Sequence, residues 1–188
     1  MNATDEDHPP LRPSPRASNI SADEAPAGWV RQRGGSDCAI AALATAMSAT
    51  YEDTAAMLGF SCDPVTRDAI GVDNGMMMLE LGAPLLRKGW SGTLLFCDGL
   101  HLVGDEARER AAGRVMVKTQ ELAALIVGRT AVLQVWKEGP LGPNRHFVAY
   151  RDGQIIDTDE AGFATYELAK VRVMLAMVLV QSQPASQP

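Results

Sequence analysis

The sequence predicts an α+β fold in which helices come first and a mostly antiparallel sheet follows. Residues 38–48, CAIAALATAMS, are small or apolar on every side, which is typical of a buried helix. The second half contains several short runs rich in β-branched or aromatic residues. Asp152-Gly153 lies between two of these runs and is a strong signal for a β-hairpin.

The composition of the two ends limits the folded domain. Residues 1–27 are rich in Pro, Ser, Asp and Glu and contain almost no large apolar residue, which predicts a disordered arm. Residues 181–188 resemble the arm and predict a disordered tail. A single domain is therefore expected over residues 28–180. The arm is interpreted as a plain tail, and an inhibitory or cleaved pro-segment is the alternative.

The first half of the domain is expected to be helical. Ser36 or Asp37 can cap the start of the buried helix. Thr50 has the spacing of a capping box and predicts a second helix at residues 51–59. Residues 74–90 are expected to be helical in two pieces, because Gly and Pro interrupt the run.

The second half is expected to form the sheet. Thr119 can cap a helix over residues 120–128. Alternating or apolar β-rich runs predict strands at residues 93–96, 114–117, 131–136, 145–151, 154–157 and 171–180.

Charge and composition argue against several classes of partner. The net charge of −6 comes without a basic patch, which argues against nucleic-acid binding. No apolar run reaches membrane-spanning length, and the acidic, Pro-containing start does not resemble a signal peptide. A cytoplasmic protein without a membrane partner is therefore expected, and its oligomeric state stays open. The three cysteines show no paired ligand spacing, so we expect reduced thiols, no metal and no cofactor.

Cys38 is a candidate nucleophile because it stands where a Gly-Ser-Asp loop turns into the buried helix. A thiol attacks as its thiolate, and a helix N-terminus favours that anion. A packed, unreactive thiol is the alternative, since cysteine is among the most buried residue types. Cys62 is expected in a loop and Cys97 at the end of a strand.

A nucleophilic cysteine needs a base, and the chain has three histidines. His8 lies in the predicted arm and His101 in a predicted loop. His146 begins a predicted strand after a Gly- and Pro-rich loop, where a side chain can face a cleft.

The predicted hairpin supplies an acid for this base. A two-residue turn at 152–153 places His146 opposite Asp159, and Asp157 opposite Val148. Because side chains alternate along a strand, His146, Asp157 and Asp159 are then expected on one face. Such a carboxylate can orient the imidazole. The backbone N–H of Cys38 and the side-chain amide of Gln32 are candidate donors to an oxyanion.

The order of these residues resembles that of papain-like cysteine peptidases. The closest resemblance is to the small bacterial peptidase domains that cleave bacteriocin leader peptides after a double glycine. DCAIAALATAMSATYEDTAAMLG (residues 37–59) resembles their cysteine segment, and GRTAVLQVW followed by HFVAYRDGQIIDTDEAG (residues 128–136 and 146–162) resembles their C-terminal half. The resemblance covers most of residues 29–180 and is poor in the middle.

The resemblance implies a cleft between a helical part and a sheet part. It implies Cys38 as nucleophile, His146 as general base and acid, Asp157 as the orienting acid with Asp159 as its substitute, and Gln32 as an oxyanion donor. Ala39 stands where the family usually has Gly, and its methyl group is expected to narrow the cleft. Thr158 stands where Pro often follows the acid.

A peptide or protein substrate is therefore expected, cleaved by a peptidase or isopeptidase through a thioester on Cys38. Domains of this kind also occur in phages and secretion systems, so a phage origin or secretion without a signal peptide is open. Deamidases, transglutaminases and acyltransferases form the same thioester. A papain-like module that binds without catalysis is the alternative outside enzymes.

Overall fold

The computed structural model describes residues 20–21, 24–72, 75–99, 116–139, 142–159 and 162–182. Its helical segments are α1 (Cys38–Met47), α2 (Tyr51–Leu58), η2 (Met78–Leu81), α3 (Gly82–Arg87), α5 (Thr119–Ile126) and η4 (Leu168–Lys170). Its strands are β1 (Trp90–Phe96), β2 (Thr130–Gly139), β3 (Gly142–Arg151), β4 (Gln154–Asp157), β5 (Ala164–Tyr166) and β6 (Val173–Gln181). The predicted α+β class is confirmed.

The strands form a six-stranded sheet in the order β1-β6-β2-β3-β4-β5, and all neighbouring strands are antiparallel. The predicted hairpin is present between β3 and β4, where Arg151 pairs with Gln154. Asp152 and Gly153 have positive φ angles of 54° and 81°, which a two-residue turn of this hand requires. The turn therefore sets the register of the strands that carry the candidate base and acid.

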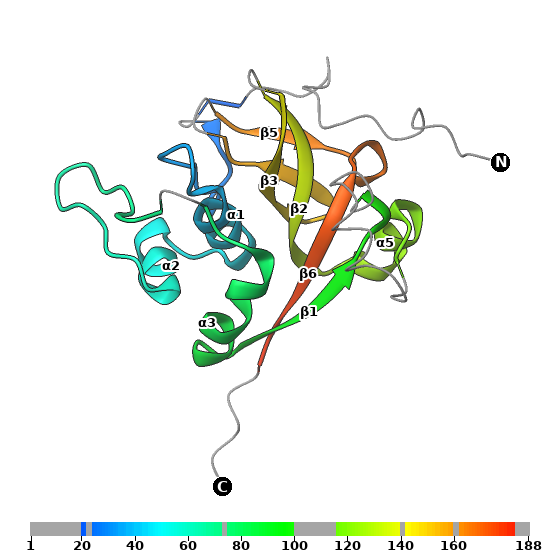
Figure 1. The fold of residues 1–188 in the computed structure, drawn as a ribbon, viewed down its shortest axis with the longest axis horizontal. Coiled ribbons are helices and arrows are strands. Elements are labelled where there is room, and N and C mark those ends of the chain that lie inside the picture. The colour runs from blue at the N-terminus through cyan, green and yellow to red at the C-terminus, as the bar shows by residue number, and fades with distance from the viewer. Residues whose placement is uncertain are drawn as a thin grey trace, which may run out of the picture.

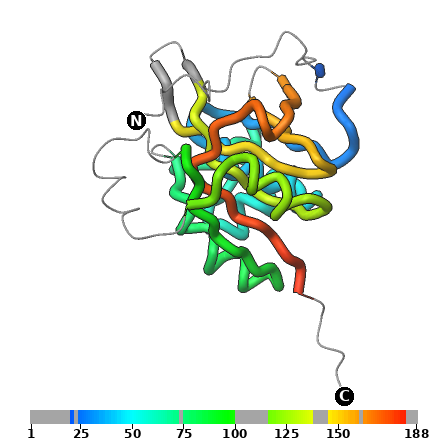
Figure 2. Tube along the Cα trace, turned by 90° about the vertical axis from the view of Figure 1, so that its right-hand side faces the viewer, coloured from blue at the N-terminus to red at the C-terminus, as the bar shows by residue number. Residues whose placement is uncertain are grey.

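Helices cover both faces of the sheet (Figure 1). Seen from the side of α5, that helix lies in front of the sheet, with α1 and α2 behind it (Figure 2). Alternation along the paired strands explains this arrangement. Val132 and its partner Ala149 belong to the core cluster that contains α1, whereas Leu133 and Val148 belong to the cluster that contains α5. The central strands are apolar on both faces because both faces are covered.

The buried helix α1 positions the candidate nucleophile. Its side chains from Ala39 to Ala46 are buried, and most of them are alanines. Small side chains let a helix axis approach a sheet closely without leaving voids. The N-terminus of α1, and with it Cys38, is thereby held at one end of the sheet.

The other predicted helices of the first half are also present. The Thr50 hydroxyl accepts a hydrogen bond from the Asp53 N–H at 3.1 Å and caps α2, which ends at Gly59 with a φ of 94°. The two predicted pieces within residues 74–90 are η2 and α3, which meet at Gly82.

The ends of the folded domain differ from the prediction. Ile20, within the predicted arm, forms an antiparallel bridge with Phe163, with N–H to O distances of 3.0 and 3.2 Å. The Phe163 ring also meets Trp29 edge-on, with centroids 5.6 Å apart. The domain therefore begins before residue 28, because the sheet edge offers backbone partners that composition does not reveal. At the other end, the Ser182 N–H donates to the Gly89 carbonyl at 2.7 Å.

Three features of the second half also differ. The expected strand at 114–117 is represented in the described residues by Val117, in an isolated parallel bridge with Cys97. Thr119 does not cap α5: it is the first residue of that helix, and its hydroxyl donates to Asp98 at 3.0 Å. Strand β5 was not expected, because three residues are too few to carry an alternation.

Because α1 is packed through small side chains, we expect Ala42→Leu to lower the free energy of unfolding by about 1–3 kcal/mol through overpacking. Urea unfolding with an unchanged m-value measures this effect. Ala56→Leu, at an exposed position of α2, is the matched control and is expected to stay within about 0.5 kcal/mol of wild type. Equal effects of the two substitutions would contradict close packing of α1.

Candidate active site

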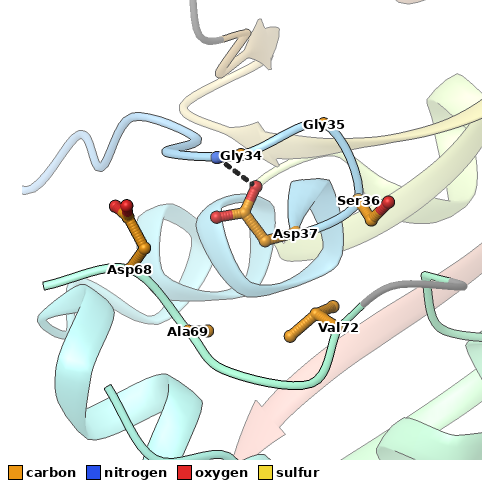
Figure 3. A pocket seen from close by; sticks show the side chains of 7 residues that line it. All are labelled: Gly34, Gly35, Ser36, Asp37, Asp68, Ala69 and Val72. Atoms are coloured by element: carbon orange, nitrogen blue, oxygen red, sulfur yellow. Dashed lines mark hydrogen bonds between the residues drawn. The ribbon is translucent and has the colours of Figure 1, made fainter. Parts of the chain in front are cut away.

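Cys38 is the first residue of α1 and is half-buried. The expected side-chain cap is not formed, because the buried carboxylate of Asp37 turns back toward the preceding loop. Its oxygens accept the N–H groups of Arg33 at 3.2 Å and Gly34 at 3.1 Å, the latter shown in Figure 3, and the hydroxyl of Tyr51. The loop that leads to Cys38 is therefore folded around this carboxylate.

Side chains of α2 complete the support of this loop. The Arg33 guanidinium lies 4.1 Å from the centroid of the Tyr51 ring and 3.1 Å from the Glu52 carboxylate. Burial and the hydrogen bond to Asp37 raise the pKa of Tyr51, so its hydroxyl stays a donor. Arg33, Asp37 and Tyr51 were not predicted to support the site. The Asp-Cys pair and the Tyr-Glu pair of the family resemblance were the available signal.

His146 and Asp157 are in direct contact and both are buried. Nε2 of His146 lies 2.7 Å from Oδ1 of Asp157. Burial raises the pKa of Asp157, but its interactions with His146 and Lys137 outweigh this, and the net pKa is lowered. An ionised carboxylate only accepts, so Nε2 carries the proton and donates it to Asp157. Nδ1 is then the ring nitrogen that can face the thiol.

The thiol of Cys38 lies beside His146, where it raises the pKa of the imidazole. Burial lowers the pKa of His146, but its interactions with Asp157 and Cys38 outweigh burial, and the pKa is raised to about 9. The structure thus brings Cys38, His146 and Asp157 together from α1, β3 and β4. A protonated imidazole beside a thiolate is the pairing that activates a cysteine.

Lys137, near the end of β2, also belongs to this cluster. Its Nζ lies 2.8 Å from Oδ2 of Asp157 and 2.7 Å from Oδ2 of Asp159. Asp157 therefore contacts the imidazole, whereas Asp159 contacts the lysine that Asp157 also binds, Lys137. Sequence reasoning missed Lys137 because the predicted strand ended at residue 136. The available signal in the sequence was the position of Lys137, a cation directly after an apolar strand that pairs with the strand of His146.

Gln32 links the loop before α1 to the strand that carries the acid. Its backbone N–H donates to the Thr158 carbonyl at 2.7 Å, and its side-chain amide nitrogen donates to the Gly34 carbonyl. That nitrogen has two N–H groups, so one remains for another acceptor. The buried Oε1 of Gln32 and Oγ1 of Thr158 have no hydrogen-bond partner in the part of the chain that the structure describes.

The remaining candidates lie apart from this cluster. Ala39 is fully buried in the core, so its methyl group does not narrow a cleft as expected. Burial raises the pKa of Cys97 to about 12, and burial together with Glu52 raises the pKa of Cys62. His8 and His101 lie outside the described residues.

A pocket of about 260 Å³ opens beside the start of α1. Figure 3 shows the loop from Gly34 to Asp37 on one side and the segment with Asp68, Ala69 and Val72 on the other. The glycines of this loop leave open space where side chains would otherwise project. The pocket is thus adjacent to the loop that delivers the thiol.

No protein-family model matches the chain, and no curated protein matches it. Among the described residues, no group of three or more His, Cys, Asp or Glu side chains could hold a metal ion. In that same part of the chain, no helix is both long and apolar enough to cross a membrane.

The raised pKa of His146 predicts that alkaline pH destabilises the fold. An unfolded histidine has a pKa of about 6.5, so the protonated imidazole stabilises the fold fully below about pH 6.5. That contribution, about 3 kcal/mol, is lost as the pH rises through about 9. Urea unfolding between pH 6 and 9.5 measures it. His146→Gln is expected to lack this part of the slope, and an identical slope in both proteins would contradict the assignment.

Proposed function

We propose that the protein is a papain-like cysteine peptidase or isopeptidase that cleaves a peptide or protein substrate through a thioester on Cys38. One observation carries the proposal. A half-buried thiol at the start of a buried helix lies beside an imidazole that is itself hydrogen-bonded to a buried carboxylate. Cys38 lies far from His146 in sequence, and Asp157 lies on the neighbouring strand of the hairpin, so the fold assembles this group from three elements.

The chemistry follows from the roles these atoms can fill. The Cys38 thiolate attacks the substrate carbonyl, and the charge on the carbonyl oxygen is received by the Cys38 backbone N–H and the free N–H of Gln32. The N–H groups of the first helical turn have no partner within the helix. The His146 imidazolium then protonates the leaving amine and, once neutral, takes a proton from the water that hydrolyses the thioester.

Two features support a substrate that enters from the loop side of α1. The pocket beside residues 34–37 is lined by the loop that leads to Cys38. The Gln32–Thr158 hydrogen bond holds the oxyanion donor against the strand that carries Asp157. The position of Cys38 beside His146 also favours catalysis over a binding module with a decayed site.

Selective alkylation tests whether Cys38 is an activated thiol. We expect iodoacetamide at pH 7 to modify Cys38 at least about tenfold faster than Cys62, because only the thiolate reacts. Cys97 is expected to be protected, since it is buried and its pKa is raised. Mass spectrometry of peptides from the folded protein gives the three rates.

His146→Gln is the control for this measurement, because it removes the base and keeps the thiol. It is expected to bring Cys38 to the rate of Cys62. Equal rates at the three cysteines of the wild-type protein would overturn the proposed nucleophile. A peptide aldehyde that protects Cys38 from iodoacetamide further indicates that the thiol reacts with a carbonyl.

The role of Gln32 predicts a kinetic effect. Gln32→Ala is expected to lower the rate of acylation by p-nitrophenyl acetate by roughly 10²–10³-fold, the usual effect of removing one oxyanion donor. Release of p-nitrophenol measures this rate. Gln154→Ala, at an exposed position of the hairpin, is the control and should leave it unchanged. An unchanged rate in Gln32→Ala would remove Gln32 from the mechanism.

A further inference from the structure

Asp157 binds a different cation with each of its two oxygens. Oδ1 lies 2.7 Å from His146 Nε2, and Oδ2 lies 2.8 Å from Lys137 Nζ. The same ammonium group lies 2.7 Å from Asp159. Asp157 is almost fully buried, whereas the Asp159 side chain is 40% exposed. The contacts thus run in a chain from the imidazole to the surface.

We propose that Lys137 is a positioning residue for the base: it fixes the Asp157 carboxylate and limits the field that this carboxylate exerts on the His146 imidazole. The catalytic importance of this role rests on the proposed function. The contact itself and its effect on the imidazole do not depend on any activity.

Geometry gives the first part of this role. A carboxylate held by one oxygen can rotate about its Cβ–Cγ bond, whereas a carboxylate held by both oxygens has a fixed plane. The bond to His146 is directional, so a fixed carboxylate also fixes the imidazole ring. The Nδ1 atom is thereby kept in the direction of Cys38.

Electrostatics gives the second part. A buried carboxylate without a second cation would stabilise the imidazolium strongly, because charges interact more strongly at low dielectric. An imidazolium that is held too tightly is a poor general acid. The positive charge of Lys137 partly neutralises the negative charge of Asp157, and the negative charge of Asp159 in turn partly neutralises that of Lys137. The charges of Lys137, Asp157, Asp159 and the imidazolium cancel.

The ionisable groups around the imidazole are contributed by several elements. They are Cys38 on α1, Lys137 on β2, Asp157 at the end of β4, Asp159 just after it, and Tyr166 on β5. Burial and the nearby Asp157 raise the pKa of Tyr166, so it stays neutral while the imidazole titrates. The Cys38 thiol lies beside the imidazole, so the measurement is also made in a Cys38→Ser background.

The titration of His146 in the full-length chain tests the proposal. Histidine labelled with ¹⁵N is followed by NMR, and His146→Gln assigns the signal among the three histidines. Lys137→Met is expected to raise the His146 midpoint by about half a unit or more, because Asp157 then acts on the imidazole unopposed. Lys137→Arg keeps the charge and is expected to restore the wild-type midpoint.

Asp159→Asn provides a second test that does not remove a partner of the buried Asp157. In this variant Lys137 pairs with Asp157 alone and neutralises more of its charge. The imidazolium is then less stabilised, so the His146 midpoint is expected to fall. This variant decides the matter even if Lys137→Met fails to fold. An unchanged midpoint in the folded variants, or a fall in Lys137→Met, would overturn the proposal and leave Lys137 with a purely structural role.

Acylation by p-nitrophenyl acetate separates this proposal from the proposed function. Lys137→Met is expected to lower the acylation rate about tenfold and to move its alkaline limb with the His146 midpoint. If Lys137→Met shifts the His146 midpoint but the wild-type protein forms no acyl-enzyme, the proposed function is wrong and the role of Lys137 stands. If the wild-type protein is active but Lys137→Met leaves the midpoint unchanged, the role of Lys137 is wrong and the proposed function stands.

Discussion

The hydrogen bond from the Gln32 N–H to the Thr158 carbonyl joins the two halves of the site. Gln32 belongs to the loop that enters α1, and Thr158 follows the acid at the end of β4. The packing of α1 on the sheet sets how far the helix stands from the strands, but it does not fix the direction of the loop before it. This one bond, at 2.7 Å and between buried residues, ties that loop to the strand that carries Asp157.

Two buried carboxylates then organise the two halves. Asp37 gathers the backbone N–H groups of the loop and the Tyr51 hydroxyl, and so shapes the approach to Cys38. Asp157 binds His146 and Lys137, and so orients the candidate base. A buried charge is costly unless it is paired and hydrogen-bonded, and both groups meet this condition. The carboxylate of the helical half, Asp37, accepts from neutral donors, whereas Asp157 in the sheet half is bound by Lys137 and by the imidazole.

The parts of the fold and site that follow from local chemistry could be predicted from sequence. The Asp152-Gly153 turn sets the β3–β4 register, so His146 and Asp157 were expected on one face, and their side chains do meet. Lys137 depends on the pairing of β2 with β3, which no turn in the described residues reveals. The Ile20–Phe163 bridge is made by backbone atoms, which carry no side-chain pattern. The Asp37 carboxylate accepts hydrogen bonds from loop N–H groups instead of capping α1, and composition does not show which of these two sets of hydrogen bonds forms.

Ala39 and Thr158 differ from the pattern of the peptidase family that the sequence resembles, and both lie where the structure does not use the side chain in the site. Successive residues of a helix point about 100° apart, so Cys38 can face His146 while the Ala39 methyl lies in the core. At Thr158, the group that the fold uses is the backbone carbonyl, which any residue supplies. Neither substitution therefore removes an atom that the proposed mechanism requires. His146, Asp157, Lys137 and Asp159 form one run of contacts, and Cys38 lies beside its imidazole end. A change at Lys137 or Asp159 is therefore expected to reach the thiol through the imidazole.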